Sequence, residues 1–316
     1  MTTRPLVHPE LDAFLDQFPA FTVTAETLPL LRQGLPSPEE TPPPDPNVVV
    51  EERWIPGPAG APEVRVLVYR PAGPPSSVPG LLWIHGGGYV LGSADGDDLL
   101  VRDFVSKVGC MAVSVDYRLA PETPFPGPVE DCYAALTWMH AQAGELGLNP
   151  ARIAIGGASA GGGLAAALGL LARDRGEVTL AFQLLIYPML DDRTVTHPDP
   201  HPHVGEFVWT RESNHFGWQS LLGHEPGMAT VSPYAVAARA ESLAGLPPTF
   251  INVGTLDLFL EEDLEYARRL LRAGVPTELH VYPGAYHGFN MVKLASPVQD
   301  FDRDVITALR RGLGQA

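Results

Sequence analysis

The strongest constraint on the fold of this chain is a serine that lies between two segments of different character. An apolar run, Arg152 to Gly156, leads into Gly157-Ala158-Ser159-Ala160-Gly161, and small residues continue from Gly162 to Leu171. The first run predicts a buried strand and the second a closely packed helix. Only small residues fit beside a serine in so tight a strand-to-helix turn. Such a turn would hold the hydroxyl of Ser159 above the carboxyl edge of a sheet, which is the arrangement called a nucleophile elbow.

Strand-like and helical segments alternate along most of the chain. The strand-like runs cover residues 81–85, 111–116, 152–156, 179–187, 249–253 and 278–282. Helical patterns lie between them, for example the apolar spacing of Val129, Cys132, Leu136 and Met139. This alternation predicts an α/β fold with a mostly parallel central sheet and helices on both faces. Two earlier runs, 48–55 and 64–69, read as a hairpin at the sheet edge.

Two segments fall outside this pattern. In residues 1–46, the spacing of Leu11, Phe14, Leu15 and Phe18 predicts an amphipathic helix, and a proline-rich linker runs from Pro36 to Pro46. Residues 189–232 contain no clean strand and are rich in histidine, proline and aromatic residues. An insertion of this length usually forms a lid. We therefore divide the chain into 1–46, a core of 47–188 and 233–316, and an insertion of 189–232.

Charge and composition exclude several classes of function. The formal net charge is −16, which disfavours binding to nucleic acid or to an anionic membrane. Residues 1–8 lack the apolar core of a signal peptide, and the most apolar stretch, 164–172, is too short to span a bilayer. The two cysteines, Cys110 and Cys132, are interpreted as free core thiols, with a disulfide or a reactive thiol as the alternative. We expect a cytoplasmic protein without a cofactor.

A nucleophilic serine needs a base and a carboxylate that orients the base. The predicted base is His287, in a glycine-containing loop after the last strand-like run; a structural histidine is the alternative. The predicted acid is Asp257, just past the preceding strand, where it could instead cap a helix that begins near Glu261. Asp191 or Asp192, one strand earlier, is the rival acid.

Donors for an oxyanion are predicted in His85-Gly86-Gly87-Gly88, directly after the strand-like run 81–85. Consecutive glycines let several N–H groups point toward one position, although a flexible turn would have the same composition. The predicted donors are the N–H groups of Gly86, Gly87 and Ala160. His85 is expected to brace the loop by hydrogen bonding rather than to act as the base, and Gly88 and Asp116 are further supporting residues.

Several motifs together resemble the hormone-sensitive-lipase-like esterases, the bacterial family IV. They are His85-Gly86-Gly87-Gly88-Tyr89, the run from Asp116 to Glu122, the serine turn with Gly162, Leu243 to Pro248, Ala273 to Pro276, and His287-Gly288-Phe289. The resemblance spans residues from about 80 to 290. It implies an α/β-hydrolase core and a cap made from the N-terminal helices and the insertion. It also implies metal-free hydrolysis of short- to medium-chain carboxylic esters, with Ser159 as nucleophile, Asp257 as acid and His287 as base.

The sequence departs from the family pattern at two places. Ala158 precedes the serine where Asp or Thr is common, which removes a polar group beside the nucleophile. Leu258-Phe259 follows the acid where the family often has Pro-Leu, which we expect to reshape the pocket wall. Neither departure removes a predicted catalytic residue.

Other interpretations stay open at this point. The same fold serves plant gibberellin receptors, but these lack the catalytic histidine; an amidase, lactonase or deacetylase would keep the same three residues. The histidines between His197 and His203 are separated by prolines and lack zinc-ligand spacing, so we expect a solvated loop and no metal site. Aromatic side chains could line the substrate pocket or pack the lid; the candidates are Tyr89, Trp209, Phe216, Trp218 and Phe289, with Phe207 nearby. The expected partner is a small-molecule ester, and a homodimer through the last strand and helix is an alternative to a monomer.

Overall fold

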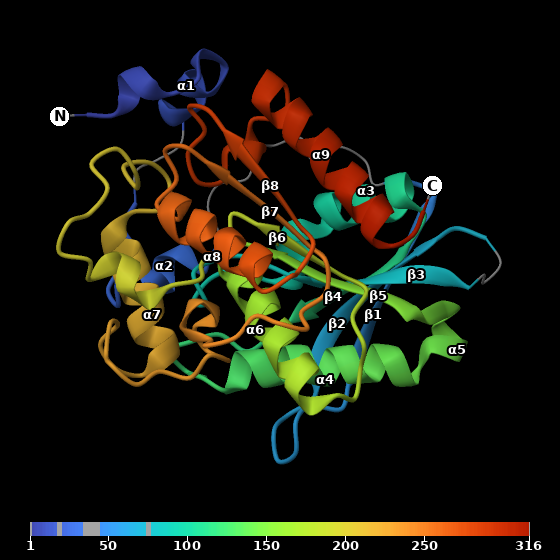
Figure 1. Ribbon diagram of the computed structural model, residues 1–316. Coiled ribbons are helices and arrows are strands. Elements are labelled where there is room, and N and C mark those ends of the chain that lie inside the picture. The colour runs from blue at the N-terminus through green and yellow to red at the C-terminus, as the bar shows by residue number, and fades with distance from the viewer. Residues whose placement is uncertain (1, 18–20, 34–44, 74–76, 316) are drawn as a thin grey trace.

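The computed structural model, which describes residues 2–17, 21–33, 45–73 and 77–315, is built on one eight-stranded sheet (Figure 1). The strands lie in the order β1-β2-β4-β3-β5-β6-β7-β8. β1 and β2 form an antiparallel hairpin, β2 pairs antiparallel with β4, and all other neighbours are parallel. The strand bounds are β1 Val48–Ile55, β2 Val64–Pro71, β3 Val78–Ile84, β4 Met111–Asp116, β5 Leu148–Ala158, β6 Phe182–Ile186, β7 Thr249–Gly254 and β8 Thr277–Tyr282.

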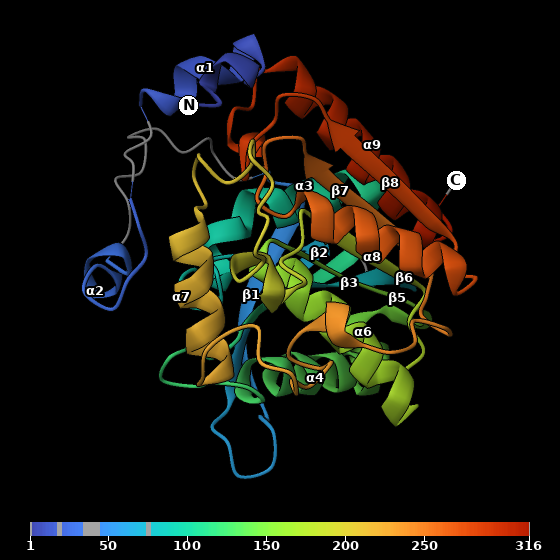
Figure 2. The same ribbon diagram turned by 60° about the vertical axis from the view of Figure 1, so that its left-hand side comes forward.

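Helices cover both faces of the sheet. The α-helices are α1 Pro9–Leu15, α2 Leu28–Leu31, α3 Asp98–Val108, α4 Gly127–Ala141, α5 Ala143–Leu146, α6 Ala160–Arg175, α7 Arg211–Leu222, α8 Leu260–Arg272 and α9 Ser296–Gly312. Short 3₁₀ turns are η1 Arg4–Leu6, η2 Ala94–Asp97, η3 Asp192–Val195, η4 Ala237–Arg239 and η5 Phe289–Met291. α3 and α9 lie on one face, and α4, α6 and α8 on the other (Figures 1 and 2).

The central strands are apolar on both sides because both of their faces are covered. In β3, Leu82 and Ile84 point into the core beneath α4 and α6, whereas Leu81 and Trp83 point into the core beneath α3 and α9. All four side chains are fully buried. The continuous apolar runs in the sequence therefore match a parallel sheet between two helical layers, and the predicted α/β fold is confirmed.

The strand predictions are accurate to a few residues at most ends. The structure has the hairpin strand 48–55 and the strand 111–116 with the predicted bounds. β5 begins earlier than predicted, at Leu148, and β6 is shorter, because residues 179–181 precede the ladder. The first helix is also shorter than predicted: α1 ends at Leu15, and Phe18 and most of the proline-rich linker lie outside the described residues.

The N-terminal segment contacts the core at two separate places (Figure 2). Near α1, His8 N–H donates to Gly284 O at 3.0 Å, and Tyr286 Oη–H donates to Leu11 O at 3.1 Å. Near α2, Val23 N–H donates to Ser213 Oγ of α7 at 3.0 Å. The N-terminal residues thus pack on the loop after β8 and on the insertion, and a cap formed by these two parts stays a prediction.

The insertion, residues 189–232, is described throughout and contains η3 and α7 but no strand. The division of the chain into a core, an N-terminal part and an insertion stays a prediction. Within the part of the chain that the structure describes, no helix has both the length and the apolarity needed to cross a membrane. Cys110 and Cys132 are free and buried, as predicted.

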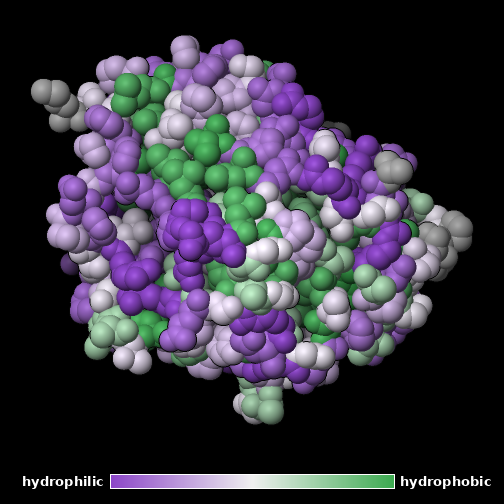
Figure 3. All heavy atoms as spheres, viewed as in Figure 1, coloured by the Kyte–Doolittle hydropathy of each residue, from purple (hydrophilic) through white to green (hydrophobic). Residues whose placement is uncertain are grey.

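The surface is mixed in character. Figure 3 shows hydrophilic residues over much of the face drawn in Figure 1, crossed by a hydrophobic band near the beginning of α8. Exposed apolar side chains of the chain include Leu264 and Leu271 of α8 and Met291 of η5.

Candidate active site

Ser159 forms the junction between β5 and α6 with a strained backbone, φ 57° and ψ −122°. This conformation is costly for a residue with a side chain and needs support from its surroundings. The serine N–H donates to Ile186 O at 2.9 Å, and its carbonyl accepts from Gly163 N–H at 3.0 Å and from Met189 N–H at 2.9 Å. Three backbone neighbours, at the end of β6, just after β6 and in the first turn of α6, therefore hold the turn in place.

The glycines of the turn are required by close backbone contacts. A Cβ at Gly157 would lie 2.3 Å from Gly161 O, and one at Gly161 would lie 2.1 Å from Ile84 O. Both neighbours are backbone atoms of packed elements and cannot move aside cheaply. The glycines of the motif thus allow the backbones of β3, β5 and α6 to approach one another closely.

Replacing Gly161 by alanine is expected to lower the free energy of unfolding by about 1–3 kcal/mol, because the added methyl overpacks a rigid site. The measurement is urea unfolding followed by circular dichroism. Gly144→Ala is the matched control, since a Cβ there meets nothing within 4 Å. Equal stability of the two variants would contradict this interpretation of the turn.

Three side chains from separate loops form a continuous hydrogen-bonded chain. His287 Nε2 lies 2.9 Å from Ser159 Oγ, and His287 Nδ1 lies 2.8 Å from Asp257 Oδ2. Asp257 is fully buried, whereas Ser159 and His287 retain 7% and 6% of their surface. The structure therefore brings the three predicted residues together, with the serine and the histidine still reachable from solvent.

Asp257 is not the helix cap that its alternative interpretation required, because the N-cap of α8 is Phe259 and no side chain among the described residues caps this helix. The second oxygen of Asp257, Oδ1, accepts from Phe259 N–H at 3.0 Å in the turn before α8. The two carboxylate oxygens therefore face different donors. The backbone bond fixes the carboxylate's orientation toward His287.

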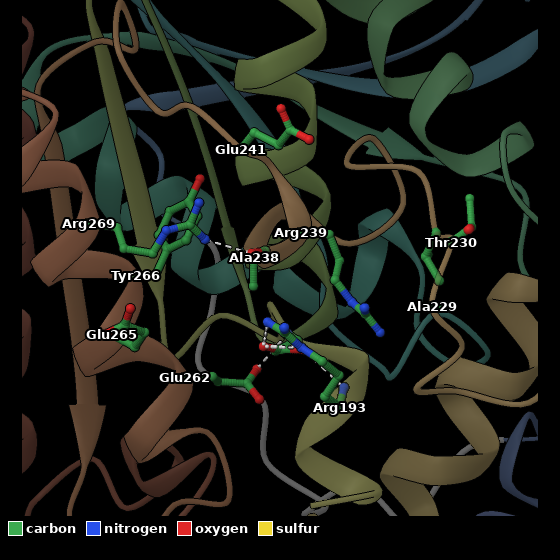
Figure 4. A pocket seen from close by; sticks show the side chains of 12 residues that line it. Arg193, Ala229, Thr230, Ala238, Arg239, Glu241, Glu262, Glu265, Tyr266 and Arg269 are labelled. Carbon is green, nitrogen blue, oxygen red and sulfur yellow. Dashed lines mark hydrogen bonds and ion pairs between the residues drawn. The ribbon is translucent and has the colours of Figure 1, made fainter.

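The rival acids have other partners. Asp191 pairs with Arg193 at 2.6 Å, and buried Asp192 pairs with Arg239 at 2.8 Å and accepts from Gly227 N–H at 2.6 Å. Asp191, Arg193 and Arg239 line a polar cavity of about 550 Å³, and Figure 4 shows the two arginines around it together with Glu262. Glu262 accepts from Leu190 N–H at 2.6 Å, so these acids organise the chain after β6 instead of contacting His287.

The glycine loop after β3 lies against the serine turn. A Cβ on Gly86 would be 3.0 Å from Ala158 O and 3.4 Å from Ser159 Cβ, so the loop backbone touches the serine. Gly87 has φ 118°, and a side chain there would collide with Leu91 O. Within the described ranges, the N–H groups of Gly86 and Gly87 donate no hydrogen bond. Ala160 N–H lies in the first turn of α6, where helix amides have no partner within the helix.

The supporting residues lie beneath this loop. His85 is buried, its Nδ1 lies 2.8 Å from Gly86 O, and its ring stacks on Tyr117 at 4.3 Å between centroids. Burial lowers the pKa of His85, which favours the neutral ring. Asp116 Oδ1 accepts from Ala94 N–H at 3.0 Å. These contacts agree with the predicted bracing function of His85 and Asp116.

The aromatic residues predicted to line the substrate pocket differ in how deeply their side chains are buried. Trp209 reaches both His287, at 6.5 Å between ring centroids, and Gly88, where a Cβ would lie 2.1 Å from the indole. Phe216 on α7 is only partly buried and packs on the core. The other three, Tyr89, Trp218 and Phe289, are fully buried. Their surroundings favour packing over a contact with substrate, because they expose no surface.

Two aromatic rings beside His287 were not predicted as site residues. No sequence signal indicated Tyr187, and Phe259 was indicated only as a departure from the family pattern. Tyr187, which follows β6, has φ 33° and presents its ring to His287 at 4.8 Å between centroids; its hydroxyl donates to Asn290 Oδ1 at 2.8 Å. Phe259 packs edge-on against His287 at 5.0 Å. Phe259 is one of the two departures from the family pattern, and the structure places it against the base.

Asp263 on α8 is a further buried carboxyl that the sequence did not suggest. No residue in the described ranges hydrogen-bonds either of its oxygens. Burial, with the carboxylates of Glu262 and Asp257 nearby, raises the pKa of Asp263 well above its usual value. A protonated Asp263 adds no negative charge behind the acid of the site.

The strand order and the strand–serine–helix turn define the class of the α/β-hydrolases. Comparisons with known proteins agree. The family model described as alpha/beta hydrolase fold matches residues 81–291. The carboxylesterase NlhH of Mycobacterium tuberculosis is 34% identical over 98% of this chain and 97% of its own length, and the carboxylic ester hydrolase LipN of the same organism is 38% identical over 88% and 74%.

Solved structures give the same result. A bacterial heroin esterase superposes with a TM-score of 0.90 at 42% identity over 99% of both chains. The esterase LipW from Mycobacterium marinum superposes with a TM-score of 0.83 at 34% identity over 98% of this chain and 96% of its own. The chain belongs to the α/β-hydrolase family, in its hormone-sensitive-lipase-like group, and the prediction of an enzyme of the carboxylesterase class is confirmed.

Proposed function

We propose that the chain hydrolyses short- to medium-chain acyl esters through a covalent acyl-enzyme on Ser159. The observation that carries the proposal is the hydrogen-bonded chain from Ser159 Oγ through His287 to Asp257, at 2.9 and 2.8 Å. Both distances lie within the reach that proton transfer requires. The chemistry needs a carboxylic ester and water.

In the first half of the reaction, His287 Nε2 takes the proton of Ser159 Oγ–H as the oxygen attacks the ester carbonyl carbon. The buried Asp257 carboxylate accepts from His287 Nδ1–H and stabilises the imidazolium that forms. The tetrahedral intermediate collapses, the bond to the alcohol oxygen breaks, and His287 returns the proton to the departing alcohol. Ser159 is left as an acyl ester.

In the second half, water takes the place of the alcohol. His287 Nε2 removes a proton from the water as it attacks the acyl carbon. The bond between the acyl carbon and Ser159 Oγ then breaks, His287 returns the proton to Oγ, and the carboxylic acid and free Ser159 are released. The oxyanion of each tetrahedral state would accept from the N–H groups of Gly86, Gly87 and Ala160. Loss of one such donor typically slows catalysis about 10²- to 10³-fold.

A receptor without activity is the alternative from a different class of function. The intact bonds between His287 and its two partners argue against it, because a receptor has no need for an oriented base. An amidase, lactonase or deacetylase would use the same residues, and the substrate series below separates them from an esterase.

The acyl-chain preference is expected to favour p-nitrophenyl acetate, butyrate and hexanoate over dodecanoate, with kcat/KM at least about tenfold lower for dodecanoate. The physical reason is the Trp209 ring packed on Gly88 beside the nucleophile, which limits the length of chain that fits. The measurement is the initial rate for each ester, with p-nitroanilides of the same acids as the amide arm. Faster cleavage of the anilides would point to an amidase, and a maximum at dodecanoate would contradict the proposed chain length.

A further inference from the structure

One five-residue segment of the insertion, Gly205 to Trp209, touches all three loops of the candidate site. Gly205 N–H donates to Leu256 O at 3.1 Å, one residue before Asp257. Phe207 packs on Tyr286 at 6.0 Å between ring centroids, one residue before His287. We call this segment the roof.

The second half of the roof contacts the base and the oxyanion loop. Val208 Cγ1 lies 3.7 Å from the position of a Cβ on Gly288, and the Trp209 indole covers Gly88 and faces His287. Acid, base and oxyanion loops are otherwise far apart in the sequence. Because the roof contacts all three loops, a shift of the roof would change its contacts with each of them.

The backbone of the roof is held in a conformation that it does not favour. Val208 has φ 62°, and Trp209 N–H donates to Phe207 O at 2.7 Å, which closes a tight three-residue turn around a β-branched residue. Such a turn is rare and strained. The Trp209 ring is fixed by a bond from Nε1–H to Asn214 Oδ1 at 3.0 Å. A strained turn persists only when its surroundings hold it.

Glu206 is the one roof residue that points away from the catalytic loops. Its carboxylate accepts from Thr3 N–H at 2.5 Å, from Thr3 Oγ–H at 2.6 Å and from the hydroxyl of Thr2. Burial raises the pKa of Glu206, but the hydrogen bonds from Thr2 and Thr3 outweigh it and bring the pKa below the usual value. Both ribbon views draw the N-terminal residues close to the loop that precedes α7.

We propose that Glu206 is a positioning residue, which through its bonds to Thr2 and Thr3 holds the roof so that Trp209 stays packed on the oxyanion loop and limits the acyl chain. This inference rests on the proposed ester hydrolysis and deepens it. Glu206 itself touches no reacting atom. Its effect passes through Trp209, so it alters substrate fit more than the chemical step.

The test compares Glu206→Ala with Glu10→Ala, using p-nitrophenyl acetate and octanoate. Glu10 is a matched control because its carboxylate also accepts a backbone N–H and a hydroxyl, both from Ser296, but at the start of α9. Glu206→Ala is expected to lower KM for octanoate by about three- to tenfold, because the released Trp209 no longer limits the acyl chain, with KM for acetate and kcat for both esters within about twofold. Glu10→Ala is expected to leave all of these within about twofold. Thr3→Val, which keeps the shape and removes one hydroxyl donor, should give a smaller fall of the same kind.

A double-mutant cycle with Trp209→Ala tests the route of the effect. If Glu206 acts through Trp209, adding Glu206→Ala to Trp209→Ala changes KM by less than about twofold. Additive effects, an unchanged or raised KM for octanoate in Glu206→Ala, or an equal fall in Glu10→Ala would each overturn the inference. If wild type and Ser159→Ala hydrolyse these esters equally, the proposed function fails instead, so the two failures are distinguishable.

Discussion

Replacing Ser159 by alanine is expected to lower kcat for ester hydrolysis by about 10⁵- to 10⁶-fold, since the catalytic residues act as one unit. The oxygen that forms the acyl-enzyme is lost, and His287 then has no hydroxyl to deprotonate. The measurement is the initial rate with p-nitrophenyl butyrate, supported by mass spectrometry for a covalent adduct after treatment with an organophosphate. Wild type is expected to gain the adduct and the variant is not.

The matched control is Ser114→Ala. Ser114 is a fully buried serine of β4, and its hydroxyl has no bonding partner within the described residues. Its removal should leave kcat within about twofold, because it contacts neither the base nor the oxyanion loop. A Ser159→Ala variant that is folded, as judged by circular dichroism, and as active as Ser114→Ala would rule out Ser159 as the nucleophile.

Changing Asp257 to asparagine is expected to reduce kcat by about 10³- to 10⁴-fold, the second-largest effect. The amide cannot stabilise the imidazolium, and its NH₂ group favours the His287 tautomer that carries the proton on Nε2, where it cannot accept the serine proton. The fold should be retained because the Asn carbonyl can still accept from Phe259 N–H. The measurements are kcat and the midpoint of thermal unfolding.

Two variants decide between the candidate acids. Asp191→Asn breaks the ion pair with Arg193, in which the Asp191 side chain is 15% exposed, and His287 bonds to Asp257 instead, so kcat is expected within about threefold of wild type. Asp192→Asn removes the partner of Arg239 in a buried pair and should lower stability before it lowers kcat. A larger loss of kcat in Asp191→Asn than in Asp257→Asn, with both proteins folded, would move the acid one strand earlier.

Local patterns were sufficient to predict the architecture of the sheet. The apolar runs of β3 to β7 are bounded by polar or glycine-containing turns, and β8 alternates polar and apolar residues, so the positions of these strands follow from their side-chain patterns. Errors occurred at strand ends, as for β6, because the apolar residues Leu180 and Ala181 continue the pattern although the hydrogen-bonded ladder begins only at Phe182. The shorter α1 shows that apolar spacing alone does not set where a helix stops.

The three main residues of the candidate site could be predicted because the ends of the strands could be predicted. Ser159, Asp257 and His287 each follow a strand, and the carboxyl ends of parallel strands meet at one edge of the sheet. The surrounding aromatic residues were not predictable in this way. Nearness in sequence to the site favoured Tyr89 and Phe289, and the aromatic content of the insertion favoured Trp218, yet all three are buried, whereas Tyr187 packs on His287 and no sequence pattern indicated it.

By itself, then, the sequence determined which segments form the strands, where the small-residue turn at Ser159 lies, and which residues are the candidates for base and acid. These follow from short-range rules, since steric limits on glycine and the period of apolar residues act within a few positions. Only the tertiary structure decided that Gly205 to Trp209 lies over all three loops and that Glu206 meets Thr2 and Thr3. Those contacts join residues between about 50 and 200 positions apart, and their geometry depends on the packing of the whole chain.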